Sequence, residues 1–290
     1  MFVRRLGIDI GGTKTLCVVV DDSVDGGSVV DERKVPTNPT GDAAAAIVDL
    51  ARTFGEIDSV GVGIAGLVSR DGDVVVTTHL PGVRELPLRE RVASQLGLPV
   101  VVDNDATCAA VAEWRIGAAR GIDDALMVTL GTGIGGGAIV GGRVARGHNG
   151  FAGEFGHMVV ARGGEPCPCG RRGCWEAYAS GGGLARLAGG VASETVVERF
   201  LDGDSRATEV VTSFADWVVV GLHNLVNIYD PACIVLGGGL GSRPEIVELV
   251  SIRFAEGEGG HVGRALPSLV AAVLGQRAGA IGAAFIGAGD

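Results

Sequence analysis

Four side chains of the types that ligate zinc lie close together in the sequence. They are His157, Cys167, Cys169 and Cys174, with the spacing H-x9-C-x-C-x4-C. Three thiolates and one imidazole form a complete tetrahedral set for zinc and leave no open position for a reacting water. The spacing therefore predicts a structural zinc ion rather than a catalytic one. A disulfide between Cys167 and Cys169 would be strained at this separation.

Two carboxylates flank these ligands. Glu154 precedes His157 by three residues, and Glu176 follows Cys174 by two. A zinc ion that fixed the loop would also fix these carboxylates, which can accept hydrogen bonds from a polyhydroxylated ligand. As exposed surface acids they would need no functional explanation. Their place beside the zinc ligands favours a binding role.

A further candidate site is Asp103-Asn104-Asp105, between the apolar run 99–102 and a helical pattern over 106–114. Reacting groups of α/β folds often lie where a strand ends. Helix capping is the alternative, because Asp and Asn are both favoured as caps. One cap needs one such residue and there are three, so we expect function in addition to capping. Asp9, at the end of the first predicted strand, is a candidate to hold a metal-bound water near nucleotide phosphates.

Glycine-rich turns follow three predicted strands, at residues 11–14, 131–136 and 237–239. Glycine lets backbone amides approach an anion closely, and Thr13 and Thr132 each add a hydroxyl donor. Ordinary hairpin turns are the alternative for any one of them. A P-loop is excluded, because Lys14 is not in the required place and a strand pattern follows it. Residues 131, 133 and 136 match the dinucleotide-binding spacing, but no helix pattern follows them.

These residues must be positioned by alternating strands and helices. Apolar patterns predict strands over 6–10, 15–21, 59–64, 74–77, 99–102, 125–130, 138–140 and 233–236. They predict helices over 42–51, 88–96, 106–114, 211–229 and 277–288. Asp42 is the expected N-cap of the first of these helices, and Gly97 is expected to end the second. The alternation indicates the α/β class. The strand–glycine turn–strand module at residues 10–20 recurs at 130–140, which favours a duplicated, two-domain architecture.

Composition narrows the class of partner. The formal net charge of −10 would repel a nucleic-acid backbone, so we expect no nucleic-acid partner. No secretory signal is recognisable, because Asp9 interrupts the apolar stretch that follows Arg4 and Arg5. The uncharged run 125–142 holds seven glycines in eighteen residues, so we expect no membrane span there. We expect a cytoplasmic protein in which Cys17, Cys108 and Cys233 are small buried side chains.

Together these motifs resemble the ROK family (repressor, open reading frame, kinase), in order along nearly the whole chain. The segments that carry the resemblance are residues 9–14, 104–106, 131–137, 153–157 and 167–176. The resemblance implies an actin-like ATPase (ribonuclease H-like) fold with two α/β domains around a central cleft. The expected N-terminal domain is 1–115 plus 276–290, because the final helix returns to it. The expected C-terminal domain, with the zinc loop, is 116–275.

The resemblance also implies roles for individual residues. Asp105 would accept the proton of the attacking sugar hydroxyl, and His157 would both ligate zinc and contact the sugar. The other expected sugar contacts are Asn104, Glu154, Glu176 and Gly66. The residues expected to bind ATP are Asp9, Gly11, Gly12, Thr13, Lys14, Gly131, Thr132, Gly133, Gly135 and Gly238. Family repressors carry a DNA-binding domain before the first strand; only five residues precede Leu6 here, so we expect a kinase.

Among the kinases, Cys174 to Gly181 most resembles the bacterial ATP-dependent glucokinases. We therefore expect phosphorylation of a hexose, glucose to glucose 6-phosphate, with ATP, Mg²⁺ and structural Zn²⁺, by a homodimer or homotetramer. Thr78-His79, Val83 and Thr107 depart from the family pattern and leave the sugar open. The alternatives are kinases for N-acetylmannosamine, N-acetylglucosamine or fructose, a polyphosphate-dependent glucokinase, and a sugar sensor without turnover.

Overall fold

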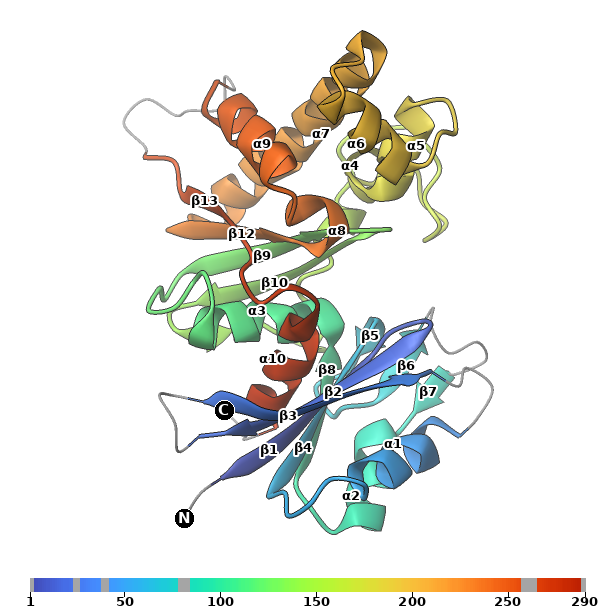
Figure 1. The fold of residues 1–290 in the computed structure, drawn as a ribbon, viewed down its shortest axis with the longest axis vertical. Helices are drawn as coiled ribbons and strands as arrows, with labels where there is room; N and C mark the ends of the chain where they lie inside the picture. The colour runs from blue at the N-terminus through green and yellow to red at the C-terminus, as the bar shows by residue number, and fades with distance from the viewer. Residues whose placement is uncertain (1–2, 23–26, 38–41, 78–83, 257–264, 288–290) are drawn as a thin grey trace. The chain divides into compact units, whose positions relative to one another are not determined.

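The chain folds into two compact units, which Figure 1 shows in a computed structural model. The structure describes residues 3–22, 27–37, 42–77, 84–256 and 265–287. The first unit comprises residues 1–123, 137–153 and 274–290, and the second comprises 124–136 and 154–273. The departures at Thr78, His79 and Val83 lie outside the described residues.

The first sheet has the strand order β3-β2-β1-β4-β8. Its strands are β1 (Arg4–Ile10), β2 (Lys14–Asp21), β3 (Ser28–Pro36), β4 (Ser59–Ile64) and β8 (Val100–Asn104). β1 and β2 form the predicted antiparallel hairpin, and β4 runs parallel to both β1 and β8. Asp9 and Asn104 therefore lie toward the same end of this sheet, where parallel strands finish.

The second sheet repeats this plan in the order β11-β10-β9-β12-β13. Its strands are β9 (Ala125–Leu130), β10 (Ile134–Val140), β11 (Arg143–Val144), β12 (Cys233–Gly237) and β13 (Ser268–Ala271). β12 runs parallel to both β9 and β13, as β4 runs parallel to β1 and β8. The shared strand order confirms the predicted repeat and the α/β class.

One predicted strand was too short. The sequence predicts a strand over 138–140, but β10 begins at Ile134 and includes the glycines that the sequence places in a turn. At Gly137 a Cβ would lie 2.5 Å from the Cβ of Ala110. Glycine within a strand often marks such a close approach, so Gly137 serves packing rather than turn formation.

Helices of the first unit begin and end largely as predicted. They are α1 (Ala43–Ala51), α2 (Leu88–Leu96), α3 (Asp105–Ile116) and α10 (Ala278–Ile286), and 3₁₀ helix η2 (Gly275–Arg277) precedes α10. The Oδ1 of Asp42 accepts hydrogen bonds from Ala44 N and Ala45 N, which confirms the predicted N-cap. Gly97 ends α2 in the left-handed conformation. A small antiparallel sheet, β5 (Gly66–Val68), β6 (Val74–Thr77) and β7 (Arg84–Leu86), completes the described part of this unit.

Helix α10 packs so closely on the first sheet that glycine is required at the contact. A Cβ on Gly7 of β1 or Gly61 of β4 would overlap backbone atoms of α10. A Cβ on Gly282, in α10 itself, would overlap the backbone of Cys108 in α3. Helix α10 therefore packs into the core of the first unit.

The second unit contains the other helices of the described chain. They are η1 (Phe155–His157), α4 (Glu176–Ala179), α5 (Gly181–Leu187), α6 (Ser193–Leu201), α7 (Ser205–Tyr229), α8 (Gly238–Gly241) and α9 (Pro244–Glu256). Trp217 of α7 stacks on Tyr178, with ring centroids 4.2 Å apart, and Tyr229 packs edge-on against Phe155. Both aromatic residues are packing residues.

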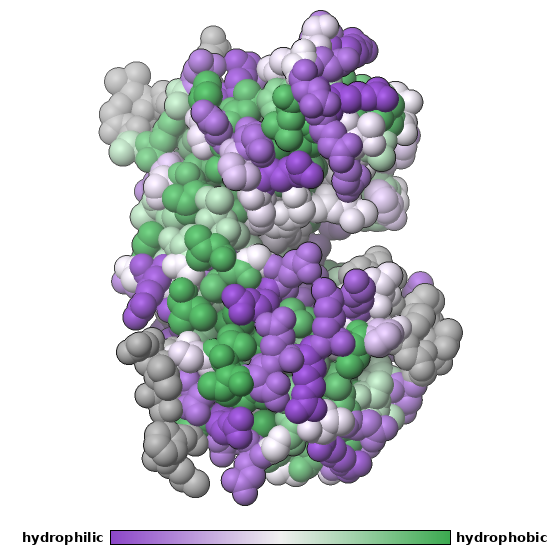
Figure 2. Space-filling view, in the orientation of Figure 1, coloured by the Kyte–Doolittle hydropathy of each residue, from purple (hydrophilic) through white to green (hydrophobic). Residues whose placement is uncertain are grey.

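Charged side chains mark the exposed edge of the first sheet. Exposed Glu32 and Lys34 alternate with half-buried neighbours along the edge strand β3, and hydrophilic and hydrophobic side chains are mixed over this face (Figure 2). Such charges protect a sheet edge from pairing with another chain. Cys17, Cys108 and Cys233 are buried, as predicted, and all six cysteines are free. Among the described residues, no helix combines the length and apolar character that a membrane crossing demands.

Candidate active site

The predicted site residues are divided between the two units. The first unit carries Asp9, the turn 11–14, Gly66, Asn104 and Asp105. The second carries Glu154, His157, Glu176, Gly238, the turn 131–135 and the three clustered cysteines. Each unit therefore builds its own set of candidate groups from its own elements.

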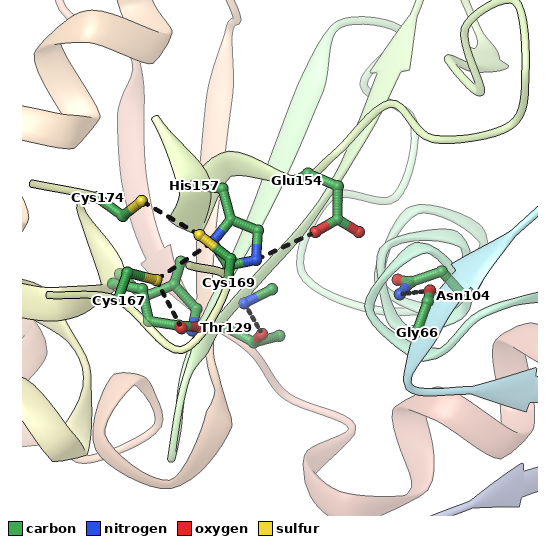
Figure 3. A network of polar contacts seen from close by, with 11 residues as sticks. Gly66, Asn104, Thr129, Glu154, His157, Cys167, Cys169 and Cys174 are labelled. Atoms are coloured by element: carbon green, nitrogen blue, oxygen red, sulfur yellow. Dashed lines mark hydrogen bonds and ion pairs between the residues drawn. The ribbon is translucent and has the colours of Figure 1, made fainter. Parts of the chain in front are cut away.

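Asn104 is the N-cap of α3. Its Oδ1 accepts hydrogen bonds from Ala106 N at 2.9 Å and from Thr107 N at 3.0 Å. Its Nδ2 donates to Gly66 O at 3.2 Å (Figure 3). Gly66 has φ +147°, and a Cβ there would overlap Val76 O, so glycine is needed to present this carbonyl. The side-chain amide is thus held at both its oxygen and its nitrogen.

Asp103 is held by a residue that the sequence motifs do not indicate, Arg146. Arg146 Nε donates to Asp103 Oδ2 at 2.8 Å, with side chains 18% and 7% exposed. The other carboxylate oxygen of Asp103 accepts a hydrogen bond from Asn104 N at 2.8 Å. Buried charges are normally paired in this way. The three polar residues of the motif therefore differ in role, because Asp103 forms an ion pair and Asn104 caps the helix.

Asp105 begins α3 and is half-buried. The pKa of Asp9 is raised to about 7, first by burial and second by the charge of Asp105. Asp105 therefore lies within electrostatic range of Asp9. Burial, followed by Asp103, Asp9 and Asp105, also raises the pKa of the Cys108 thiol well above its ordinary value. Three carboxylates thus act on one buried thiol, and Arg146 is the cation that opposes them there. This excess negative charge suits a proton acceptor and a nearby cation.

Thr37, the residue that follows β3, holds the first glycine turn through hydrogen bonds to its backbone. Gly11 N donates to Lys14 O at 3.1 Å, and Thr37 Oγ1 donates to Gly11 O at 2.8 Å. Thr37 N donates to Thr13 O at 3.0 Å. Gly12, Thr13 and Lys14 remain exposed. A turn that is rigid at its base and open at its tip can offer amides, a hydroxyl and an ammonium group to an anion.

The four predicted zinc ligands converge, with all ligand atoms within 4.8 Å of one another. Cys169 Sγ lies 3.7 Å from Cys174 Sγ, and Cys167 Sγ lies 3.8 Å from His157 Nδ1 (Figure 3). For Zn–S bonds of about 2.3 Å, a tetrahedron has ligand–ligand edges of about 3.8 Å. The residues present therefore fit a structural zinc ion held by three thiolates and His157 Nδ1.

His157 points its two ring nitrogens in different directions. Nδ1 faces the sulfur cluster, whereas Nε2 lies 3.8 Å from Glu154 Oε2. That separation is too long for a hydrogen bond. Ligation through Nδ1 would place the proton on Nε2, so the ring could donate from that side to a ligand hydroxyl.

The three thiols differ in acidity without a metal. Burial raises the pKa of Cys167 to about 12. The backbone amide of Arg171 is the largest influence on exposed Cys169 and lowers its pKa to about 7. A bound zinc ion would hold all three sulfurs as thiolates, so metal binding would release protons from this loop.

The second glycine turn, residues 131–135, is held by the segment that follows the zinc loop. Ile134 N donates to Glu176 Oε2 at 2.9 Å, and Gly181 N donates to Gly131 O at 2.7 Å. Gly135 N donates to Thr129 Oγ1 at 3.1 Å (Figure 3). Within the described parts of the chain, the amides of Thr132 and Gly133 have no hydrogen-bond partner. They are the amides of this turn that can meet an anion.

The third glycine turn is set by Gly238, where β12 ends. Gly238 has φ +79°, and a Cβ there would lie 2.7 Å from Leu130 O. This places the backbone of Gly238 against the end of β9, immediately before the turn 131–135. Two of the predicted nucleotide-binding segments are therefore neighbours in the second unit.

Residues 5–289 match the ROK family. The chain is 36% identical over 306 aligned residues to the glucokinase of Streptomyces coelicolor, with 96% of each protein covered. It is 34% identical to the N-acetyl-D-glucosamine kinase of Pectobacterium atrosepticum, covering 85% of this chain and 87% of that one. Among solved structures, the Streptomyces griseus ROK glucokinase in complex with glucose and AMPPNP is similar with a TM-score of 0.83. That similarity covers 99% of this chain and 100% of the other, at 35% identity.

Proposed function

The chain belongs to the ROK family, and we propose that it transfers the γ-phosphoryl group of ATP to the 6-hydroxyl of glucose. It is a hexokinase-type phosphotransferase with the actin-like ATPase fold. The observation that carries the proposal is the half-buried Asp105 carboxylate, which begins α3 beside the Asn104 cap and within electrostatic range of Asp9. Arg146 holds the preceding Asp103 in place.

Asp105 acts as the general base in this proposal. It accepts the proton of the sugar hydroxyl as the oxygen attacks the γ-phosphorus, and such proton transfer typically contributes about 10²–10⁴-fold to the rate. Asn104 is anchored by its cap and its bond to Gly66, so it can orient the sugar without moving. Most of the remaining catalysis is positioning and charge stabilisation, as in phosphoryl transfer generally.

The nucleotide is held by backbone groups. The amides of Thr132 and Gly133, together with Gly11, Gly12, Thr13 and Lys14, surround the phosphates, and Gly238 lies toward the adenosine. Mg²⁺ bound with the nucleotide would neutralise phosphate charge, and Asp9 is the residue that would hold it through a water. The high pKa of Asp9 without a cation supports this assignment, since a divalent ion would favour the ionised carboxylate.

The sugar is held from the second unit by Glu154, His157 and Glu176. A zinc ion bound by His157 Nδ1 and the three cysteines would hold His157 in place, and with four protein ligands it would have a structural rather than a catalytic role. The family resemblance also leads us to propose a homodimer or homotetramer located in the cytoplasm. The mass in solution by light scattering tests the assembly.

Turnover against a panel of sugars and donors tests the proposed reaction. A coupled assay would compare glucose, fructose, N-acetylglucosamine and N-acetylmannosamine, each with ATP and with polyphosphate. We expect the highest kcat/KM for glucose with ATP. A higher value for an acylated hexosamine would contradict the proposed sugar. Sugar binding without transfer from either donor would contradict the enzyme and support a sensor. An Asp105→Asn preparation supplies the background rate.

A further inference from the structure

Glu176 makes a contact that its proposed role as a sugar ligand does not require. Its Oε2 accepts the hydrogen bond from Ile134 N at 2.9 Å, in the turn proposed to hold phosphates. The two residues are 42 positions apart in the sequence, so the contact is a tertiary one. A carboxylate that accepts from a backbone amide forms a charge-assisted hydrogen bond, which is stronger than a neutral one. Glu176 therefore touches the glycine turn directly.

The carboxylate also occupies the space beside Gly133. A Cβ on Gly133 would overlap Glu176 Oε2 and lie 3.1 Å from its Cδ, and all three of the nearest atoms belong to Glu176. The backbone of Gly133 does not itself require glycine, because its φ lies outside the left-handed region. What excludes a larger residue at position 133 is thus the side chain of Glu176.

The same carboxylate is tied to the zinc loop. Glu176 follows the ligand Cys174 by two residues, and its Oε1 lies 3.9 Å from Cys167 Sγ. Five residues later, Gly181 N holds the other end of the turn through Gly131 O. The zinc loop and the glycine turn therefore share one rigid connection, and Glu176 is its central side chain.

We propose that Glu176 is a positioning residue for nucleotide binding, because its carboxylate holds the turn 131–134 with the Thr132 and Gly133 amides directed to the phosphates. This rests on the proposed function, which already assigns Glu176 to the sugar. One carboxylate would then serve both substrates, so the two binding equilibria are coupled through it. Such coupling is reciprocal between the two ligands.

Binding of Mg·ADP without sugar, measured by titration calorimetry, separates this role from a sugar contact. Glu176→Ala should weaken Mg·ADP binding about tenfold or more, since it removes a hydrogen bond to a charged group. Glu176→Gln keeps an oxygen that can accept from Ile134 N, so its Mg·ADP affinity should stay within about threefold while glucose binding weakens. Glu154→Ala, which removes the other proposed sugar carboxylate, is the control for the loss of a sugar contact.

A double-mutant cycle with Gly133→Ala identifies the atoms responsible. Alone, Gly133→Ala should weaken Mg·ADP binding about tenfold or more, because the new methyl displaces the carboxylate. In the Glu176→Ala background, the same change should alter it less than about threefold. Zinc content and thermal unfolding of each variant show that the loop is intact.

Three results would overturn the proposal. They are unchanged Mg·ADP affinity in Glu176→Ala, tighter binding in both Glu176→Ala and Glu176→Gln, and an equal effect of Gly133→Ala in both backgrounds. The first result would mean that Glu176 contacts the sugar alone. The second would mean that its charge only repels the nucleotide, and the third would mean that Gly133→Ala acts through the backbone. None depends on turnover, so failure of the proposed kinase activity would be seen separately in the sugar panel.

Discussion

Asp9 and Asp105 lie close enough for the charge of Asp105 to raise the pKa of Asp9. They belong to different elements, β1 and α3, and the first sheet brings the two together. Burial is the larger cause and the neighbouring carboxylate the second, and together they bring the pKa of Asp9 to about 7. Without a bound cation, this end of the sheet therefore carries charge that opposes folding at neutral pH.

Stability without ligands should fall as pH rises. The folded protein holds the Asp9 proton up to about pH 7, but the unfolded chain releases it near 3.8. The stabilisation from protonated Asp9 is complete below pH 4 and is lost as pH rises through 7. It amounts to at most about 4 kcal/mol. Urea unfolding from pH 5 to 8 should show this slope, and Asp9→Asn should flatten it. The exposed Asp49→Asn is the control, and an unchanged slope in Asp9→Asn would contradict the assignment.

Asp105→Asn should nearly abolish turnover while the fold and sugar binding survive. The amide has the same shape but cannot accept the hydroxyl proton, so kcat should fall by about 10²–10⁴-fold. Steady-state kinetics and glucose titration measure the two effects separately. Near-normal turnover would rule out Asp105 as the base. The substitution also removes the charge that raises the pKa of Asp9, so the pH slope of stability should move to lower pH.

Arg146→Ala should destabilise the first unit strongly. It leaves the buried Asp103 carboxylate without its cation, and breaking such a pair costs about 3–5 kcal/mol. The change should appear as a lower midpoint in urea unfolding. Arg52→Ala removes an exposed partner of Asp49, and should change stability by less than about 1 kcal/mol. Equal effects of the two substitutions would contradict the importance of the buried pair.

The zinc proposal is tested by measuring the metal content of the protein. Elemental analysis should find about one zinc per chain, as a closed tetrahedral site requires. Cys169→Ser should lose the zinc and the sugar affinity together, because His157 and the flanking carboxylates are no longer fixed. Cys233→Ala, a buried cysteine outside the cluster, should keep both. A zinc-free protein with full activity would remove the structural-ion proposal.

Local signals in the sequence predicted most strands of the two large sheets and two helix ends, but not β11, β13 or the helices α5, α6 and α9. Asp42 and Gly97 mark helix ends by backbone chemistry that depends only on neighbouring residues, and both caps are confirmed. The zinc ligands were recognisable because three of the four lie within eight positions. The edge strand β3 and the short strands β5 and β7 were not predicted, since charged residues interrupt the apolar pattern of β3 and β5 and β7 have only three residues each.

The spacing of residues in the sequence could not predict which side chains pair with one another in the fold. Arg146 reaches Asp103 across 43 positions, and no motif joins the two. Glu113 is another example. It is a fully buried carboxylate whose two oxygens accept hydrogen bonds from Leu274 N and Ala118 N. Such pairs depend on which surfaces the fold brings together, so a single sequence contains no periodic signal for them.

Helix α10, near the end of the chain, determines when the first unit can finish folding. Its sheet is assembled from residues near the start of the chain, yet the space beside the glycines at positions 7 and 61 is filled by the backbone of α10. During synthesis this space stays open until all of the intervening second unit has been made. Domains usually fold in the order in which they emerge from the ribosome. Here the earlier half must wait for the later one, and a chain cut short before residue 278 would expose the apolar surface of β1 and β4.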